Sequence, residues 1–319
     1  MSIERRLGEG VTTHERNLER MAVRIPGWGG RSIGYAPLVG GLLNQNWLVE
    51  VEGHPRRYFV KVPGEGSDNF IDRVTANQAA RNAHAIGVAP EVFHFDPVDG
   101  LEVSEFLEGY RTCTMSDFFN PAIRDTVLDI YRRLHASPAL KLTKTMLDMI
   151  DEHIEQGRAN GAHYPPEIFW LERRYDSAKN AFLASGLDLV ACFNDPMPGN
   201  FLVKEDGDGR LLSLKMVDYE FASNNERTYE LGALSAEMFY EEDMTMGLVE
   251  HYFGSARRDM FARVIVNRAL ADFKWACWAV LNRRLSGWDF DYQKYGIWKY
   301  MRARDLMGDP RWESWLRMI

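Results

Sequence analysis

The sequence has few cysteines and no long apolar run, and each shortage excludes a class of protein. Its 319 residues include three cysteines, Cys113, Cys192 and Cys277, which are scattered and odd in number. They provide neither a disulfide framework nor the spacing of a zinc site, and they suit a reducing compartment. No stretch approaches the ~18 uninterrupted apolar residues that span a bilayer. We therefore expect no membrane-spanning segment.

The chain also lacks an excess of basic residues. Its formal net charge is −8, which disfavours non-specific binding to nucleic acid and is compatible with a cationic small substrate. The stretch MSIERRLGEGVTTHERNLERM at the N-terminus is charged and has no apolar secretion signal. We expect a cytoplasmic protein. A hydrophobic content of 45% is that of a globular chain.

The first third of the chain has the patterns of a β-rich lobe. The alternating runs 46–51 and 56–62 flank a turn, and VFHFD and LEVSEFL flank PVDG, so we expect two β-hairpins. A helix is expected in 69–86. We assign residues 1–107 to this lobe, with 1–35 as an extension that contains a helix from Glu15 to Val23. The extension could cover the small lobe, build a dimer contact or close over a ligand.

From about residue 110 the patterns become mostly helical, which predicts a second lobe in residues 108–319. The periods predict helices over 121–136, 142–159, 166–185, 228–252, 256–285 and 291–306. Short strands in 188–220 interrupt them. The expected fold class is α+β with two lobes: a small antiparallel β-sheet lobe with one main helix, followed by a larger, mostly helical lobe.

Three polar residues lie in the β-loop insert of the second lobe. CFNDPMPGN (192–200) places Asp195 five residues before Asn200, and Asp218 ends the apolar run LKMVDYEF. A carboxylate that orients a hydroxyl, with an Asn and an Asp that hold magnesium, is the set that phosphoryl transfer needs. Each residue alone also fits a turn or a surface loop. The triple in a strand-loop-strand context favours a functional site.

Two features of the first lobe fit a nucleotide. Lys61 lies in the strand YFVKV, where an ammonium can meet phosphates, although many strand lysines are simply solvated. The Gly40–Gly41 turn in GGLLNQNWLV can offer backbone N–H groups to phosphates. It lacks the G-x-G-x-x-G pattern, so an ordinary hairpin turn fits as well.

The C-terminal helices are rich in aromatic residues. Trp275 and Trp278 lie three residues apart on one helical face, and Tyr295 follows in the next helix. Such stripes are more often core than binding site. With carboxylates they can also form a cage for a quaternary ammonium group, and the nearby carboxylates are Glu237, Asp272, Asp289 and Asp291.

These motifs, in this order, resemble the choline/ethanolamine kinase group of the aminoglycoside-phosphotransferase superfamily, which has a protein-kinase-like fold. The resemblance runs over nearly the whole chain after residue 35. It is carried by GGLLNQNW, YFVKVPGEG, EVSEFLEG, YRRLHAS, CFNDPMPGNFLV, MVDYEF, TYELGALSAEMF and the aromatic C-terminal segment. It implies ATP and Mg²⁺ as cofactors and a small alcohol, expected to be cationic, as acceptor. A homodimer is compatible with it.

The resemblance also implies roles for single residues. Asp195 is implied as the catalytic base or hydroxyl-orienting group, with Asn200 and Asp218 as magnesium ligands. The residues implied to contact the nucleotide are Lys61, Gly40, Gly41, Asn44 and Asn46, with the backbone of Glu105 and Leu107 at the adenine. Those implied at the acceptor are Glu220, Glu237, Trp275, Trp278 and Tyr295.

The sequence departs from the family pattern at three positions. Phe193 replaces a His that braces the catalytic loop, Ala76 stands where a Glu would pair with Lys61, and Glu230 replaces an Asp. Asp72, Asp68 or Glu65 are candidates to replace the missing Glu. Two other functions therefore stay open: a kinase for thiamine, an aminoglycoside, a sugar or another metabolite, and a catalytically weakened nucleotide- or metabolite-binding protein.

Overall fold

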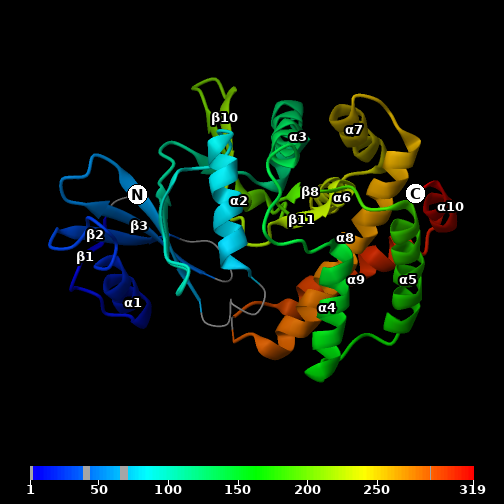
Figure 1. Ribbon diagram of the computed structural model, residues 1–319, viewed down its shortest axis with the longest axis horizontal. Coiled ribbons are helices and arrows are strands. Elements are labelled where there is room, and N and C mark those ends of the chain that lie inside the picture. The colour runs from blue at the N-terminus through cyan, green and yellow to red at the C-terminus, as the bar shows by residue number, and fades with distance from the viewer. Residues whose placement is uncertain (1–2, 39–43, 65–70, 288) are drawn as a thin grey trace. The chain divides into compact units, whose positions relative to one another are not determined.

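The computed structural model describes residues 3–38, 44–64, 71–287 and 289–319 (Figure 1). The chain divides into two compact units. Unit 1 comprises Met1–Arg111 and Leu202–Glu220, and unit 2 comprises Thr112–Phe201 and Phe221–Ile319. Residues Leu202–Glu220 therefore belong to the first unit, although they lie far along the sequence.

Unit 1 is built on a six-stranded sheet with the order β1-β2-β3-β4-β6-β5. Every pairing in this sheet is antiparallel. Its strands are β1 (Arg5–Arg6), β2 (Ile33–Leu38), β3 (Asn44–Val51), β4 (Arg57–Pro63), β5 (Val92–Phe95) and β6 (Glu102–Glu105). The hairpins β3–β4 and β5–β6 confirm the two that the alternating patterns predict.

The described residues of unit 1 also include the helices α1 (Thr13–Ala22) and α2 (Arg73–Ala85). Thr12 caps α1 in a reciprocal box with Glu15, in which each side chain accepts the other's backbone N–H. Leu18 on α1 is buried in one apolar cluster with strand residues such as Tyr35 and Val60. The N-terminal extension is thus part of the core of the small unit, the first of its three expected roles.

Unit 2 is helical around a long central helix, α8. Its helices are α3 (Pro121–His135), α4 (Met146–Ala159), α5 (Ile168–Ser185), α6 (Arg227–Glu237), α7 (Glu242–Phe253), α8 (Arg258–Leu285), α9 (Tyr292–Met307) and α10 (Trp312–Met318). Helices α4, α6, α9 and α10 all contact α8. At Gly232 on α6, an added Cβ would lie 2.7 Å from the backbone nitrogen of Arg268. Glycine therefore permits the close approach of α6 to α8.

Short strands frame the loop that contains Asp195. Strands β8 (Leu189–Cys192) and β11 (Ser223–Glu226) pair antiparallel in unit 2. A second small sheet has the order β10-β9-β7, with β7 at Arg111–Thr112, β9 at Phe201–Glu205 and β10 at Leu211–Met216. Two 3₁₀ turns, Met115–Phe119 and Pro198–Asn200, complete the described elements.

The prediction of a single helix over 228–252 is wrong, because the structure has two helices there, α6 and α7. After α6 ends, Phe239 adopts a left-handed φ of 55° and the Tyr240 N–H donates to the carbonyl of Ser235. This turn ends the helix, and a helical period that continues on both sides conceals it. The helix predicted from residue 142 begins at Met146, because the Leu142 carbonyl accepts the Asn224 N–H of β11.

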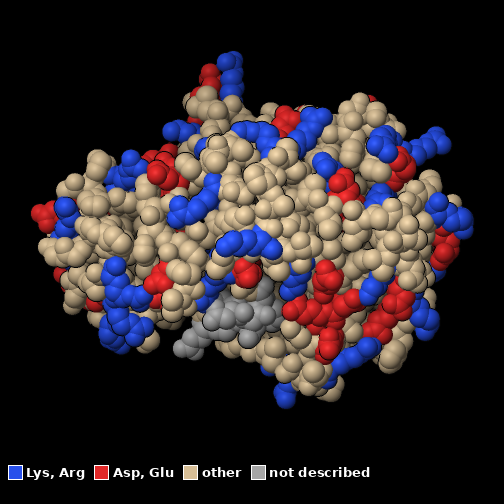
Figure 2. All heavy atoms as spheres, in the orientation of Figure 1, with Lys and Arg blue, Asp and Glu red and all other residues tan. Residues whose placement is uncertain are grey.

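The surface of unit 2 carries a concentration of acidic side chains over α4 and α5 (Figure 2). Several of them have local partners, since Glu152 pairs with Lys144, Asp151 with Lys179, and Glu172 with Arg158. Among the described residues, no helix has the combination of length and apolar character that crossing a membrane requires.

Candidate active site

Lys61 lies at the centre of a polar row on the sheet of unit 1. Its Cα is opposite Asn46 on β3 and opposite Glu102 on β6. Residues directly opposite one another in an antiparallel sheet share a face. The row therefore brings together Lys61 and Asn46, two of the residues that the sequence assigns to the nucleotide, and adds Glu102, which sequence reasoning missed.

The ammonium of Lys61 is held by two carboxylates. Its Nζ lies 2.6 Å from Asp218 and 3.2 Å from Glu220. Burial would lower the pKa of Lys61, but the charges of Asp218 and Glu220 outweigh it and raise the pKa above its usual range. The lysine is therefore fixed within unit 1 even though Ala76 stands where a helix Glu was expected.

Two carboxylates near Lys61, Glu220 and Glu102, have raised pKa values. Burial raises the pKa of Glu220, with a further contribution from the charge of Asp218, and burial also raises the pKa of Glu102. The Asn44 side chain donates a 2.6 Å hydrogen bond to Glu220. Such a crowded anionic set, neutralised by one lysine, is suited to a ligand that brings positive charge, such as a metal ion.

Asp218 has an unusual backbone conformation. Its φ is 69°, in the left-handed region that few residues other than glycine adopt. It is the second residue after the end of β10, and its side chain pairs with Lys61. Strained residues of this kind cluster at functional sites, which supports a functional assignment for Asp218.

The other predicted nucleotide residues are distributed as follows. The Glu105 N–H donates to the Glu91 carbonyl at 2.8 Å, and the Leu107 carbonyl accepts the Tyr110 N–H. Gly40 and Gly41 lie outside the described residues, as do Glu65 and Asp68. Asp72 caps its own helix by accepting the Thr75 N–H at 2.7 Å, so this carboxylate already has a structural partner.

In unit 2, the loop after β8 brings Asp195 and Asn200 together. The Asn200 Nδ2 donates to the Asp195 carboxylate at 2.9 Å and to its backbone carbonyl at 3.2 Å. Asp195 is only 8% exposed. Because Nδ2 makes both bonds, Oδ1 is the atom of Asn200 that a hard cation would take. The sequence spacing therefore gives the expected pair of neighbours.

Asn194, just before Asp195, is a second strained residue, and it lies in this loop. Its φ is 67°. Its side-chain amide donates to the Phe221 carbonyl and to Ser223, and its carbonyl oxygen accepts from Asn225. Asparagine tolerates the left-handed region better than most residues, and these bonds hold the conformation that presents Asp195.

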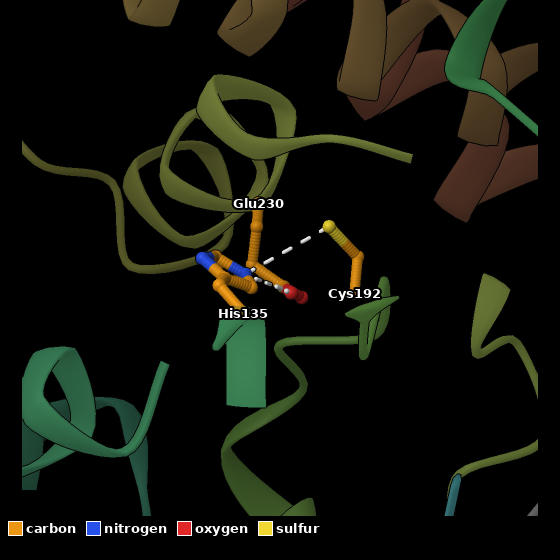
Figure 3. Close-up of side chains that lie close together, drawn as sticks. All are labelled: His135, Cys192 and Glu230. Carbon is orange, nitrogen blue, oxygen red and sulfur yellow. Dashed lines mark hydrogen bonds and ion pairs between the residues drawn. The ribbon is translucent and has the colours of Figure 1, made fainter. Parts of the chain in front are cut away.

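Glu230 on α6 braces the loop through hydrogen bonds to its backbone. Its carboxylate accepts the backbone N–H groups of Phe193 at 2.8 Å and Asn194 at 2.7 Å. His135 on α3 lies 3.0 Å away through Nε2 (Figure 3). Phe193 itself is buried and packs on Phe201, with ring centroids 6.2 Å apart. Glu230 thus holds the loop through two backbone N–H groups and needs no side-chain donor at position 193.

Cys192 lies beside this brace. Its Sγ is 3.8 Å from His135 Nε2, and one ligand atom each from His135, Cys192 and Glu230 lie within 4.8 Å of one another. The set has metal-ligating atom types, but both oxygens of Glu230 already accept backbone N–H groups. Burial raises the pKa of the Cys192 thiol, with a further contribution from Glu230. A protonated thiol and an engaged carboxylate fit a structural brace better than a metal centre.

The predicted acceptor aromatics form one cluster in unit 2. Trp275 and Trp278 are in edge contact with centroids 5.3 Å apart, and Trp278 meets Tyr295 at 6.1 Å. Phe221 and Tyr292 belong to the same cluster. This confirms that the two tryptophans lie on one helical face.

Three of the four carboxylates proposed to complete that cluster, Glu237, Asp272 and Asp291, already have partners. Glu237 accepts from Lys299 at 2.6 Å, and Asp272 accepts two 2.9 Å bonds from Arg302. Asp291 caps α9 by accepting the Lys294 N–H. Glu220 lies in unit 1, bonded to Asn44 and Lys61.

Comparison with solved structures defines the class of protein. The fold matches a choline/ethanolamine kinase family protein from Mesorhizobium loti, with a TM-score of 0.78 and 26% identity over 95% of this chain and 98% of that one. Choline kinase LicA from Streptococcus pneumoniae matches with a TM-score of 0.73 at 21% identity over 93% and 99%. The chain thus has the fold of the kinase-like phosphotransferases.

Comparison with protein families and known sequences identifies the family of this chain. The model of the choline/ethanolamine kinase family matches residues 35–253, more than half of the chain, and the chain belongs to this family. A probable choline kinase 2 of Arabidopsis thaliana is 20% identical over 291 residues, which cover 81% of each chain. The ethanolamine kinase of Saccharomyces cerevisiae is 24% identical over 260 residues, 66% of this chain and 48% of that protein.

Proposed function

We propose that this chain is an ATP- and Mg²⁺-dependent kinase that phosphorylates a hydroxyl of choline, ethanolamine or a related amino alcohol. The observation that carries the proposal is the Asp195–Asn200 pair, held at 2.9 Å in a strained loop whose backbone is fixed by Glu230. A rigid, buried carboxylate beside an amide oxygen is what in-line phosphoryl transfer requires of its protein.

Each group has a proposed role. Asp195 orients the acceptor hydroxyl and takes its proton, while Asn200 and Asp218 supply the oxygen ligands that magnesium prefers. Lys61 holds the α- and β-phosphates, the segment around Gly40, Asn44 and Asn46 covers them, and the backbone of 105–107 meets the adenine. The metal, when bound, neutralises the phosphate charge. Each residue offers an oxygen of the type that such an ion takes, a carboxylate oxygen from Asp218 and the amide Oδ1 from Asn200.

The decisive experiment is ATP consumption with magnesium across choline, ethanolamine, thiamine and an aminoglycoside. Asp195→Asn serves as the matched control, because it keeps an oxygen that can accept from Asn200 and removes the base. Turnover with one acceptor, lost in the variant, supports the proposal. If no acceptor is phosphorylated, but ATP stabilises the fold and does so only when magnesium is present, the binding-protein alternative is favoured. At a hundredfold excess over Kd that stabilisation is about 2.7 kcal/mol.

A second acceptor class is favoured by one specific observation. The carboxylates Glu237 and Asp272, which would attract a cationic acceptor, are both neutralised by cations of the chain. A kinase of this architecture for a hydroxylated metabolite without net positive charge is therefore the second candidate, and it leads to the inference below.

A further inference from the structure

Lys274 is a buried lysine in the middle of α8. Its side chain is 1% exposed, and its Nζ has no hydrogen-bond partner among the described residues. Instead, Nζ lies over the Trp275 ring, 3.1 Å from the centroid, and 4.9 Å from the centroid of Phe221. Aromatic faces attract an ammonium, but they do not replace its hydrogen bonds to water. A buried donor without an acceptor, at the edge of the predicted acceptor cluster, is a candidate ligand-binding group.

The charges that act on Lys274 come from several elements. Burial lowers the pKa of Lys274 to about 7, and the Asp195 carboxylate is the largest influence in the opposite direction. The other charged groups are Lys144 before α4, Glu152 on α4 and Lys299 on α9. Glu152 is paired with Lys144. The buried His153 on α4 in turn has its pKa lowered by burial and then by Lys274. Lys274 and Asp195 thus act on each other within unit 2.

Lys299 is a second lysine that contacts an aromatic ring of this cluster, and its ammonium has a carboxylate partner. Its Nζ lies 5.5 Å from the Tyr295 centroid and is bonded to Glu237 at 2.6 Å. Lys274 has the aromatic contact without the carboxylate. The missing partner is an anion, and a permanent cation brought to Trp275 or Phe221 would meet an ammonium already in place.

We propose that Lys274 selects the acceptor: its ammonium takes the Trp275 face that a quaternary ammonium would need and binds a carboxylate of the acceptor, so that the preferred acceptor is a hydroxy acid or a zwitterionic amino alcohol. The inference rests on the proposed function, because it concerns the acceptor of that reaction. Binding would exchange the aromatic contact for a charge-assisted hydrogen bond through rotation of the lysine side chain.

Two pairs of alcohols, whose members differ by a carboxylate in one pair and by a carboxymethyl group in the other, test this directly. Serine is ethanolamine with a carboxylate, and carnitine is a carboxylate-bearing alcohol with the quaternary ammonium of choline. We expect wild-type kcat/KM to favour the carboxylated member of each pair by about 10- to 100-fold. Lys274→Met is expected to lose most of that preference, mainly through KM. Lys274→Gln, which keeps a donor without charge, is expected to behave in the same way.

Lys179→Met is the matched control, since Lys179 also lies over an aromatic ring, Tyr175, at 5.8 Å, but is paired with Asp151. Its acceptor preference is expected to equal that of the wild type. Methionine at 274 is apolar and of similar length, so circular dichroism is expected to show a folded variant.

Equilibrium titration of tryptophan fluorescence separates this inference from the proposed function. If no acceptor is phosphorylated, but serine and carnitine bind the wild type at least tenfold more tightly than Lys274→Met, the proposed function fails and the inference stands. It is overturned if choline and ethanolamine are used or bound as well as their carboxylated partners. It is equally overturned if the Lys274 variants match the wild type, or if none of the four compounds binds.

Discussion

The two units hold the carboxylates of the candidate site in different ways. In unit 1, Asp218 and Glu220 are stabilised by the charge of Lys61. In unit 2, Asp195 is presented by a loop whose backbone N–H groups donate to Glu230. Charge pairs can re-form around an incoming ion or phosphate, whereas backbone bonds to a buried carboxylate fix a geometry. Under the proposed function, unit 1 adapts to a charged ligand, whereas unit 2 keeps the proposed catalytic carboxylate in place.

The largest expected effect is on the fixed group itself. Asp195→Asn keeps a side-chain oxygen for Asn200 but cannot take a proton, so we expect kcat to fall by about 10²- to 10⁴-fold while ATP binding changes little. Steady-state kinetics with the acceptor that the panel identifies measure kcat, and calorimetry measures ATP binding. A variant with kcat within about tenfold of wild type would show that Asp195 is not the base.

The next effect concerns the brace. Glu230→Gln replaces an oxygen that accepts N–H groups by an amide that cannot, so one buried backbone donor loses its acceptor. We expect the free energy of unfolding to fall by about 3 kcal/mol and kcat to fall with it, as measured by urea denaturation and kinetics.

Glu313→Gln is the control, because this carboxylate on α10 pairs with Arg174 at an exposed position and is expected to lose less than about 1 kcal/mol. If a chelator lowers the melting temperature of the wild type but not of Glu230→Gln, the interpretation of Glu230, His135 and Cys192 as a metal-free brace is wrong.

The buried lysines of the two units are expected to respond to pH in opposite ways. The pKa of Lys61 is raised, so its stabilising contribution is present below its unfolded value and is lost only above that. The pKa of Lys274 is lowered from 10.5 to about 7. Between these values the unfolded chain binds more protons, so stability rises with pH.

The wild type is therefore expected to gain on the order of 2–3 kcal/mol relative to Lys274→Met between about pH 7 and about pH 10. Chemical denaturation of both proteins across this range measures the difference. Parallel curves would contradict a buried, ionisable Lys274.

A smaller effect is expected at Lys61 and its carboxylate partners, Asp218 and Glu220. Lys61→Met leaves Asp218 and Glu220 without their cation and removes the proposed phosphate contact, so ATP affinity is expected to fall by about 10- to 100-fold. Calorimetry with magnesium-ATP measures it. Lys204→Met, at an exposed lysine of the same unit, is the control. If Lys61→Met and Lys204→Met bind magnesium-ATP with equal affinity, Lys61 is not part of the nucleotide site.

How much the sequence predicts depends on the distance between partners along the chain. Asp195 and Asn200 are five residues apart, and their contact follows from the turn. Glu230 was noted only as a departure from the family pattern, because its partners Phe193 and Asn194 lie far away in sequence. A buried acid inside an otherwise apolar helix pattern was the available signal.

Lys274 was missed for the opposite reason. A lysine within a helical period is ordinarily read as the solvated face, and only the packing of Trp275 and Phe221 around it reveals its burial. The sequence does not predict the break between α6 and α7 either, because the residue with the left-handed backbone is Phe239 and not a glycine, which is the usual signal for the end of a helix. Local pattern predicts elements and short loops, whereas burial of charge needs the tertiary fold.

The smallest effects come from two matched helix caps, one in each unit. Thr12 and Thr145 each accept the N–H of an acidic residue three positions on, which in turn accepts the N–H of the threonine. Thr12→Ala and Thr145→Ala are each expected to lower the free energy of unfolding by about 1 kcal/mol. Thr13→Ala, one residue inside α1 and exposed, is expected to change it by less than about 0.5 kcal/mol. Because α1 packs into the core of unit 1, Thr12→Ala should weaken that unit while kcat at saturating ATP stays unchanged. A loss of kcat with intact stability would mean that the N-terminal extension acts on the reaction itself and is more than a part of the small unit's core.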